Sequence, residues 1–249
     1  MKTKDVQREE IWHLLKERKA SRFPGTHGRI PNFVGAERCV SHLTVSSWWQ
    51  HATTVKINPD LPQRPIRQKA LEEGKLVIMP APRLRAAQPF LRLDPARLTV
   101  SPREASSIKG AAQYGSPIGL DDIDAIDLIV CGSVAVNRFG ARVGKGGGYS
   151  DLEFGLLIEA MKIKPSVPIV TSVHSLQLVE QEIDMLPHDI PVDAIVTPEG
   201  LLNLSPAFPR PAGIYWEILP EEKLASIPVL AARRTAGVGP LGLGPRVTN

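Results

Sequence analysis

The chain has 249 residues, of which 43% are hydrophobic and 22% charged, and its formal net charge is +4. This is ordinary globular composition, which excludes a fibrous or wholly disordered chain. No apolar stretch reaches the roughly 18 residues that a transmembrane helix needs. Residues 1–10 are charged and lack the apolar core of a signal peptide, so we expect an intracellular, cytoplasmic protein without a membrane partner. Cys39 and Cys131 lie far apart, so we expect buried free thiols rather than a disulfide framework or a zinc site.

The charge is distributed unevenly along the chain. Residues 1–110 contain 20 Lys and Arg against 10 Asp and Glu, whereas residues 111–249 contain 10 against 16. A basic half suggests an anionic partner, but for most of these residues a solvated face is the favoured interpretation. Charge alone does not separate nucleotide phosphates, nucleic acid and simple solubility.

The first half of the chain predicts helices alternating with short strands. An amphipathic helix is expected over residues 4–20 and a second helix over 36–50. Strands are expected over 54–57 and 76–79, each followed by a proline, with a helix over 64–73 between them. Five prolines interrupt residues 81–120 (Pro82, Pro89, Pro95, Pro102 and Pro117). We expect short strands and loops there, forming a lid or side wall of the same domain.

The pattern sharpens after residue 120. The apolar run 128–136 predicts a central buried strand, followed by a helix over 151–164 and a strand over 167–173. A short helix over 176–183 and a strand over 194–197 complete the alternation, which is typical of a parallel α/β sheet covered on both faces. We therefore expect a single α/β domain over residues 1–225. The Gly, Pro and Arg content of residues 226–249 predicts a poorly ordered tail.

The segment FGARVGKGGGYSD, residues 139–151, joins a predicted strand to a predicted helix. Four of residues 144–148 are glycines, which let a ligand approach the backbone amides closely. Arg142 and Lys145 add positive charge, and the N-terminus of the following helix adds a partial positive charge. Together these features indicate a phosphate-binding loop. The alternative is a plain connecting turn. The spacing matches neither a Walker A loop nor a dinucleotide fingerprint.

Three further residues could carry chemistry. Asp151 begins the predicted helix, where it could either stabilise the helix dipole or bind Mg²⁺ beside the phosphates. Asp189 lies in the polar segment 187–193, whose composition is that of a turn. His174 follows a predicted strand, where a single histidine is more often structural than catalytic.

These residues together resemble the 5-formyltetrahydrofolate cyclo-ligase family, also called methenyltetrahydrofolate synthetase. The similarity rests on segments 127–130, 140–146, 148–149, 188–189 and 192–193, with Asp151 and Gln177. Segments of the N-terminal half resemble a divergent branch of methenyltetrahydrofolate synthetase domain-containing proteins (28–33, 35–36, 56–60, 62–63, 74–75 and 79–84). The resemblance implies a three-layer α/β/α sandwich with a mainly parallel sheet, similar to the ribose-5-phosphate isomerase and CoA-transferase group. It also implies a ligase of folate and one-carbon metabolism, which uses Mg²⁺ and ATP to convert 5-formyltetrahydrofolate into 5,10-methenyltetrahydrofolate.

The resemblance also implies roles for individual residues. Lys145 and Arg142 are the expected catalytic cations, and Asp151 and Asp189 the expected Mg²⁺ ligands. The expected ATP-binding residues are Lys4, Arg8, Arg142, Gly144, Lys145, Gly146, Gly147, Gly148 and Tyr149. The expected residues for the second substrate are Tyr149, Asn58 and Asp60.

Two departures from the family loop leave alternatives open. The second basic residue of the loop is Gly147 in this chain, and the second tyrosine is Ser150. One alternative is a different small-molecule substrate, such as a thiamine-related one. The other is a non-catalytic module that binds a nucleotide or RNA. Aromatic residues make up only 5%, which counts against base stacking on nucleic acid. We expect a monomer or a homodimer.

Overall fold

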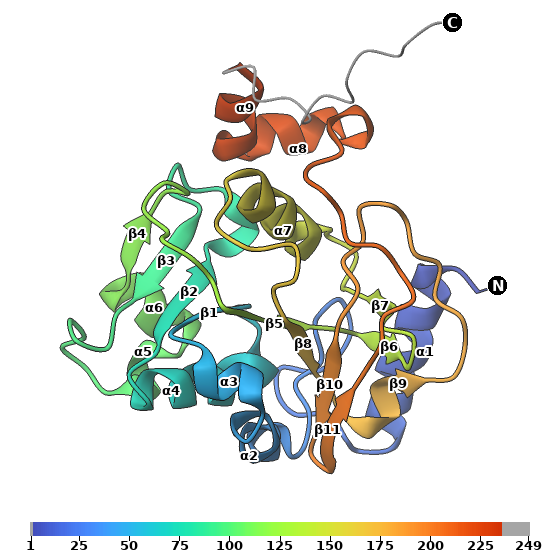
Figure 1. Cartoon of the computed structure of the whole chain (residues 1–249). Coiled ribbons are helices and arrows are strands. Elements are labelled where there is room, and N and C mark those ends of the chain that lie inside the picture. The colour runs from blue at the N-terminus through green and yellow to red at the C-terminus, as the bar shows by residue number, and fades with distance from the viewer. Residues whose placement is uncertain (1, 236–249) are drawn as a thin grey trace, which may run out of the picture.

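The computed structural model describes residues 2–235 of the chain (Figure 1). Its helices are α1 Lys4–Glu17, α2 Cys39–Thr44, α3 Ser47–His51, α4 Arg64–Glu72, α5 Pro102–Ala105, α6 Ile108–Tyr114, α7 Tyr149–Glu159, α8 Glu221–Ser226 and α9 Pro228–Thr235. Its strands are β1 Thr54–Ile57, β2 Leu76–Pro80, β3 Phe90–Leu93, β4 Ser116–Ile118, β5 Leu128–Gly132, β6 Ala135–Asn137, β7 Arg142–Val143, β8 Ile169–Ser172, β9 Leu178–Val179, β10 Ala194–Thr197 and β11 Gly200–Asn203. No helix within residues 2–235 has the length and apolarity needed to cross a membrane.

The centre of the molecule is an eight-stranded sheet in the order β11-β10-β8-β5-β1-β2-β3-β4. The five middle strands, from β10 to β2, run parallel, whereas β11, β3 and β4 pair antiparallel at the two edges. A mainly parallel sheet must be covered on both faces, because its connections place helices there. The predicted α/β fold class is confirmed.

Side chains alternate between the two faces of the sheet and build two cores. Leu128 and Val130 of β5 pack on the face covered by α2 to α4, whereas Ile129 and Cys131 pack on the face covered by α7 to α9. Figure 1 shows these helices on opposite sides of the sheet. This is the expected three-layer α/β/α arrangement. Both cysteines are buried free thiols, as predicted, and burial raises the pKa of Cys39 to about 12.

The prediction of one strand over residues 128–136 is wrong. The run divides into β5 of the central sheet and β6 of a second sheet, whose order is β7-β6-β9. Gly132 ends β5 where a Cβ atom would lie 2.6 Å from the side chain of Ile30, so the chain turns away at a packed site. Because both strands are apolar and buried, hydrophobicity does not reveal the change of sheet. Helix α1 covers the second sheet through Trp12 and Leu15.

The predicted helix over 176–183 is also wrong, because β9 pairs parallel with β6 there. The buried side chain of Gln177 donates to the carbonyl oxygens of Ser133 (2.8 Å) and Val134 (3.1 Å), which holds the segment against the second sheet. The helix predicted over 36–50 is broken into a 3-10 turn, α2 and α3. The side chain of Ser46 accepts from the Trp49 amide and so starts a new helix within the predicted one.

Two less regular segments are more ordered than predicted. Residues 81–120 contain α5 and α6, and their strands β3 and β4 extend the edge of the central sheet. The expected tail begins with α9, and Ile227 and Leu230 are fully buried against the α7 face of the sheet. The rest of the predicted tail, residues 236–249, lies outside the described residues.

Candidate active site

The glycine loop, residues 144–148, joins β7 to the N-terminus of α7. It therefore follows the short second sheet and not the central strand from which it was expected to leave. Gly146 (φ +98°) and Gly148 (φ +64°) adopt left-handed conformations that favour glycine. Gly148 is the N-cap of α7, and no side chain caps this end of the helix. The first amides of α7 are therefore available to an anion.

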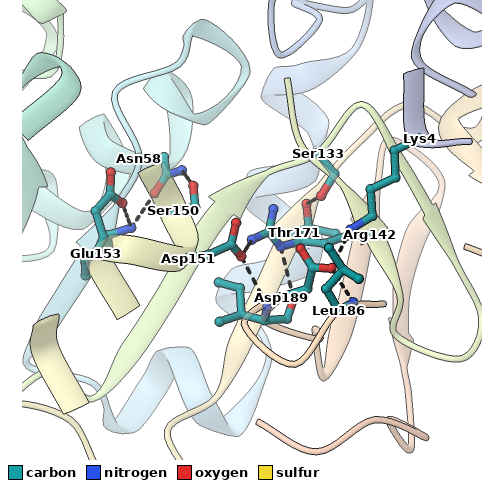
Figure 2. A network of polar contacts seen from close by, with 12 residues as sticks. Lys4, Asn58, Ser133, Arg142, Ser150, Asp151, Glu153, Thr171, Leu186 and Asp189 are labelled. Atoms are coloured by element: carbon teal, nitrogen blue, oxygen red, sulfur yellow. Dashed lines mark hydrogen bonds and ion pairs between the residues drawn. The ribbon is translucent and has the colours of Figure 1, made fainter. Parts of the chain in front are cut away.

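Arg142 is a fixed cation beneath the loop. Its side chain is buried, and its Nη2 atom lies 2.5 Å from Oδ1 of Asp151 (Figure 2). Its Nε also donates to the carbonyl oxygen of Ile190 at 3.2 Å, while the Ile190 amide donates to the same Asp151 oxygen at 3.1 Å. Burial alone would lower the pKa of Arg142, but the negative groups around it, Asp151 foremost and Asp189 and Glu153 among the others, together raise that pKa. The guanidinium is therefore charged and held in one orientation.

Helix α1 contributes two cations to the same region. Lys4 donates to Oδ2 of Asp189, which also accepts the Leu186 amide at 2.7 Å (Figure 2). One turn further along the helix, Arg8 donates through Nε to the Gly144 carbonyl oxygen at 2.7 Å and forms an ion pair with Asp5. The four-residue spacing thus places both side chains at the glycine loop and its neighbouring turn, as the sequence predicts.

Asp151 and Asp189 are the candidate Mg²⁺ ligands, and both lie close enough to Arg142 to affect its pKa. Each carboxylate uses one oxygen for its hydrogen bonds within residues 2–235, which leaves Oδ2 of Asp151 and Oδ1 of Asp189 without a protein partner. The same residues contain no group of three or more His, Cys, Asp or Glu suited to a metal. Two carboxylates are sufficient for Mg²⁺, which keeps several waters and takes further oxygens from substrate phosphates.

Lys145 and Tyr149 line the loop itself. The Nζ atom of Lys145 lies 3.0 Å from Oδ1 of Asp60, and the lysine side chain is 43% exposed. Tyr149 folds back over the loop, since a Cβ atom at Gly147 would lie 2.7 Å from the tyrosine Cδ2. The loop therefore has no room for a side chain at position 147 unless the ring moves.

Asn58 belongs to a buried polar network below the start of α7. Its Nδ2 donates to the Ser150 hydroxyl at 2.8 Å, and its Oδ1 accepts from Lys56 Nζ at 2.5 Å (Figure 2). The same ammonium lies 2.5 Å from Oε2 of Glu153. Burial raises the pKa of Glu153, although the charge of Lys56 opposes this effect. The network fixes the orientation of the Asn58 amide.

The turn after β1, which carries Asn58 and Asp60, is held by hydrogen bonds from the side chain of Arg67. This guanidinium is fully buried and donates to the carbonyl oxygens of Asp60 (3.1 Å) and Pro59 (3.2 Å) as well as that of Asn58. A fourth hydrogen bond, from Arg67 Nε to the carbonyl oxygen of Ser106 at the end of α5, ties the turn to that helix. The two predicted substrate residues are therefore presented on a rigid turn.

The predicted site residues therefore gather around the start of α7. They lie on α1, on the turn after β1, on β7 and the glycine loop, on α7, and on the turn that carries Asp189. Sequence reasoning missed Lys56, Glu153 and Arg67, although a lysine inside the apolar strand TVKI was a usable signal. It also missed Lys223 of α8. His174 has the structural role that was favoured for it. Its Nδ1 accepts the Leu176 amide at 3.2 Å, and burial lowers its pKa.

The chain belongs to the 5-formyltetrahydrofolate cyclo-ligase family, whose sequence profile matches residues 1–198. Methenyltetrahydrofolate synthase domain-containing proteins are similar over nearly the whole chain. The bovine protein (Bos taurus) is 37% identical over 91% of the chain and the mouse protein (Mus musculus) 38% over 92%. The chain spans 60% and 62% of these two relatives, respectively. The expected family and branch are confirmed.

A solved structure shares the fold. The solution structure of 5,10-methenyltetrahydrofolate synthetase from Aquifex aeolicus superposes with a TM-score of 0.52 at 23% identity, covering 87% of this chain and 99% of the other. At this identity the comparison supports the architecture of the sheet and its helices. It leaves the chemistry to be argued from the site residues.

Proposed function

We propose that this chain is a Mg²⁺- and ATP-dependent cyclo-ligase with 5-formyltetrahydrofolate as its substrate. The observation that supports this proposal best is that three kinds of group lie together at the glycine loop and its neighbouring turn. They are the open amides of α7, three cations from separate elements, and two carboxylates that each keep an oxygen available. The three cations are Lys4 of α1, Arg142 of β7 and Lys145 of the loop. Family membership of residues 1–198 supports the reaction type.

The loop would bind the ATP phosphates through the amides at the start of α7. Lys145 is the cation that can follow the transferring phosphate, because its partner Asp60 holds it at a half-exposed position. Arg142 contributes its charge from a fixed place below. A preorganised charge of this kind stabilises the transition state without rearrangement during the reaction.

The reaction balances as two displacements. The formyl oxygen attacks the γ-phosphorus of ATP and releases ADP, which leaves the formyl oxygen phosphorylated and the formyl carbon activated toward a nucleophile. The neighbouring folate nitrogen then attacks that carbon, its C–O bond breaks, phosphate departs and the nitrogen loses its proton. Mg²⁺ held by Asp151 and Asp189 would neutralise charge on the phosphates. Tyr149, Asn58 and Asp60 would orient the folate, since they lie on the loop and on the facing turn.

A thermal-shift titration tests the proposal. Mg-ATP should raise the melting temperature, because a ligand that binds only the folded state stabilises it. Addition of 5-formyltetrahydrofolate should raise it further and produce the absorbance of the methenyl product. Lys145→Met should lower kcat by roughly 10²–10³. Lys109→Met, on the exposed surface of α6, removes the same charge and should leave turnover unchanged.

The other outcomes separate the alternatives. Stabilisation by Mg-ATP without a product would favour the same nucleotide site with a different second substrate, such as a thiamine-related molecule. A wild-type protein that saturating Mg-ATP fails to stabilise would contradict the proposal and favour the non-catalytic module.

A further inference from the structure

Helix α8 delivers a lysine to the glycine loop from outside it. Lys223 Nζ donates to the Gly147 carbonyl oxygen at 2.7 Å and lies 5.4 Å from the centre of the Tyr149 ring. The helix is anchored by Leu224 and by Ile227 just beyond it, both buried in the core that covers the α7 face of the sheet. The position of Lys223 is therefore set by packing. It also lies beyond residue 198, where the family match ends.

The charge balance distinguishes Lys223 from the other cations at the loop. Each of those is paired with a carboxylate, as shown by the pairs Arg142–Asp151, Lys145–Asp60, Lys4–Asp189 and Arg8–Asp5. Within residues 2–235, no carboxylate lies within 4.0 Å of the Lys223 ammonium. Its hydrogen-bond partner is a neutral carbonyl, so no carboxylate among the described residues pairs directly with its positive charge.

Burial lowers the pKa of Lys223, while the charge of Asp151 opposes that effect. An ammonium has three hydrogen-bond donors, and the Gly147 carbonyl takes one of them. A half-buried cation with donors to spare, next to the open N-terminus of α7, is complementary to an anion.

The packing of the loop explains why this cation comes from another element. A Cβ atom at Gly147 would lie 2.7 Å and 2.9 Å from two ring atoms of Tyr149, so a side chain at position 147 would displace the ring. The loop itself therefore carries no cation at this point. Lys223 reaches the same point from α8 and contacts both the Gly147 backbone and the Tyr149 ring.

We propose that Lys223 is a phosphate-binding residue of the nucleotide site and supplies, from α8, the cation that the glycine loop lacks at Gly147. This inference rests on the proposed function in that the anion is a phosphate of bound ATP. It makes α8 a part of the site instead of an appendage to the fold. It would also allow a loop with glycine at position 147 to bind a triphosphate.

Calorimetric titration of Mg-ATP into the full chain tests this role with three variants at one position. Lys223→Met removes the charge and the hydrogen bond, Lys223→Gln keeps a donor for the Gly147 carbonyl, and Lys223→Arg keeps the charge. We expect Met and Gln to weaken binding about tenfold, the loss of one charge-assisted contact. Arg should retain most of the affinity. Lys109→Met is the matched control and should bind ATP as the wild type does.

The outcomes separate this inference from the proposed function. A wild-type chain that does not bind Mg-ATP contradicts both. Wild-type binding that Met and Gln leave unchanged contradicts the role of Lys223 and leaves the proposed function intact. Full affinity in the Gln variant alone would show a tether for the loop backbone rather than a phosphate contact. Melting curves without ligand show whether each variant folds. If Lys223→Met does not fold, the affinities of the Gln and Arg variants can still be compared with each other and with the wild type.

Discussion

Two kinds of ion pair surround the start of α7, and they differ in burial. Lys56–Glu153 and Arg142–Asp151 have N–O distances of 2.5 Å, and both cations are buried. Lys145–Asp60 is longer, at 3.0 Å, and its lysine is 43% exposed. All three pairs lie around the same loop and helix, so we infer their different roles from the difference in burial.

A buried pair costs several kcal/mol of desolvation for each ion and is stable only when its geometry and other hydrogen bonds are complete. Both buried pairs meet this condition through Asn58 and Ile190. Such pairs hold the backbone and do not exchange partners. The exposed pair gains about 0–1 kcal/mol, so its lysine can leave Asp60 for an incoming phosphate at little cost.

The largest expected effect comes from breaking the most buried pair. Lys56→Met should lower the free energy of unfolding by about 3–5 kcal/mol, because Glu153 remains buried without a counter-ion. Urea denaturation measures the change. The double variant Lys56→Met with Glu153→Leu should recover most of the loss, since two apolar side chains leave no charge to desolvate. A single variant as stable as the wild type would show that the Glu153 carboxylate does not depend on Lys56.

The stability of Lys56→Met should depend on pH in a defined direction. Burial raises the pKa of Glu153 in the folded chain, and removal of Lys56 leaves that effect unopposed. A folded-state pKa above the unfolded value means that the folded state binds the proton more tightly. Stability is therefore lost as pH rises through the folded pKa and regained below it. The deficit of Lys56→Met should shrink as pH falls from 8 toward roughly the unfolded pKa of glutamate near 4.3.

The second prediction compares the two cations that flank the loop. Arg142→Met should lower the free energy of unfolding by about 3 kcal/mol, because it leaves Asp151 partly buried and unpaired. Lys145→Met should change it by about 1 kcal/mol or less. For Mg-ATP affinity the order of the two variants should be the reverse. Lys145→Met should fold normally and lose more affinity than Arg142→Met. Urea denaturation and calorimetry on both variants check this, and equal stability losses would contradict the division into fixed and exchangeable cations.

Local sequence patterns predicted much of the fold. Strands β1 and β10 have the predicted bounds, because an apolar, β-branched run between turn residues is a local signal. The failures depend on distant contacts. Residues 128–136 divide where Gly132 meets Ile30. Within residues 176–183 the chain forms the short strand β9 next to Gln177, which bonds to residues 44 and 43 positions earlier. Hydrophobic periodicity contains no information about either contact.

The candidate site divides in the same way. The glycine loop with Arg142, Lys145 and Asp151 is contiguous, so its motif could be recognised, and the structure places these residues together. The lysine within TVKI was a usable signal for a buried cation at Lys56, but its partner Glu153, 97 residues away, could not be predicted. The contact of Lys223 with Gly147, 76 residues away, could not be predicted either. The catalytic, metal and substrate roles of the site residues remain predictions.

The smallest expected effect is a gain in nucleotide affinity when Asp60 no longer pairs with Lys145. In the absence of nucleotide Asp60 pairs with Lys145, so it competes with an incoming phosphate for this lysine. Asp60→Asn should therefore raise the affinity for Mg-ATP, by at most about fivefold, since an exposed pair is worth about 0–1 kcal/mol. The free energy of unfolding should change by no more than about the same amount. The gain should diminish at high salt, which screens the exposed pair already present in the wild type. Asp124→Asn, at an exposed position, alters the net charge equally and should leave the affinity unchanged. If Asp60→Asn instead weakened ATP binding, Asp60 would be holding Lys145 in its working position, and this pair would belong with the fixed ones.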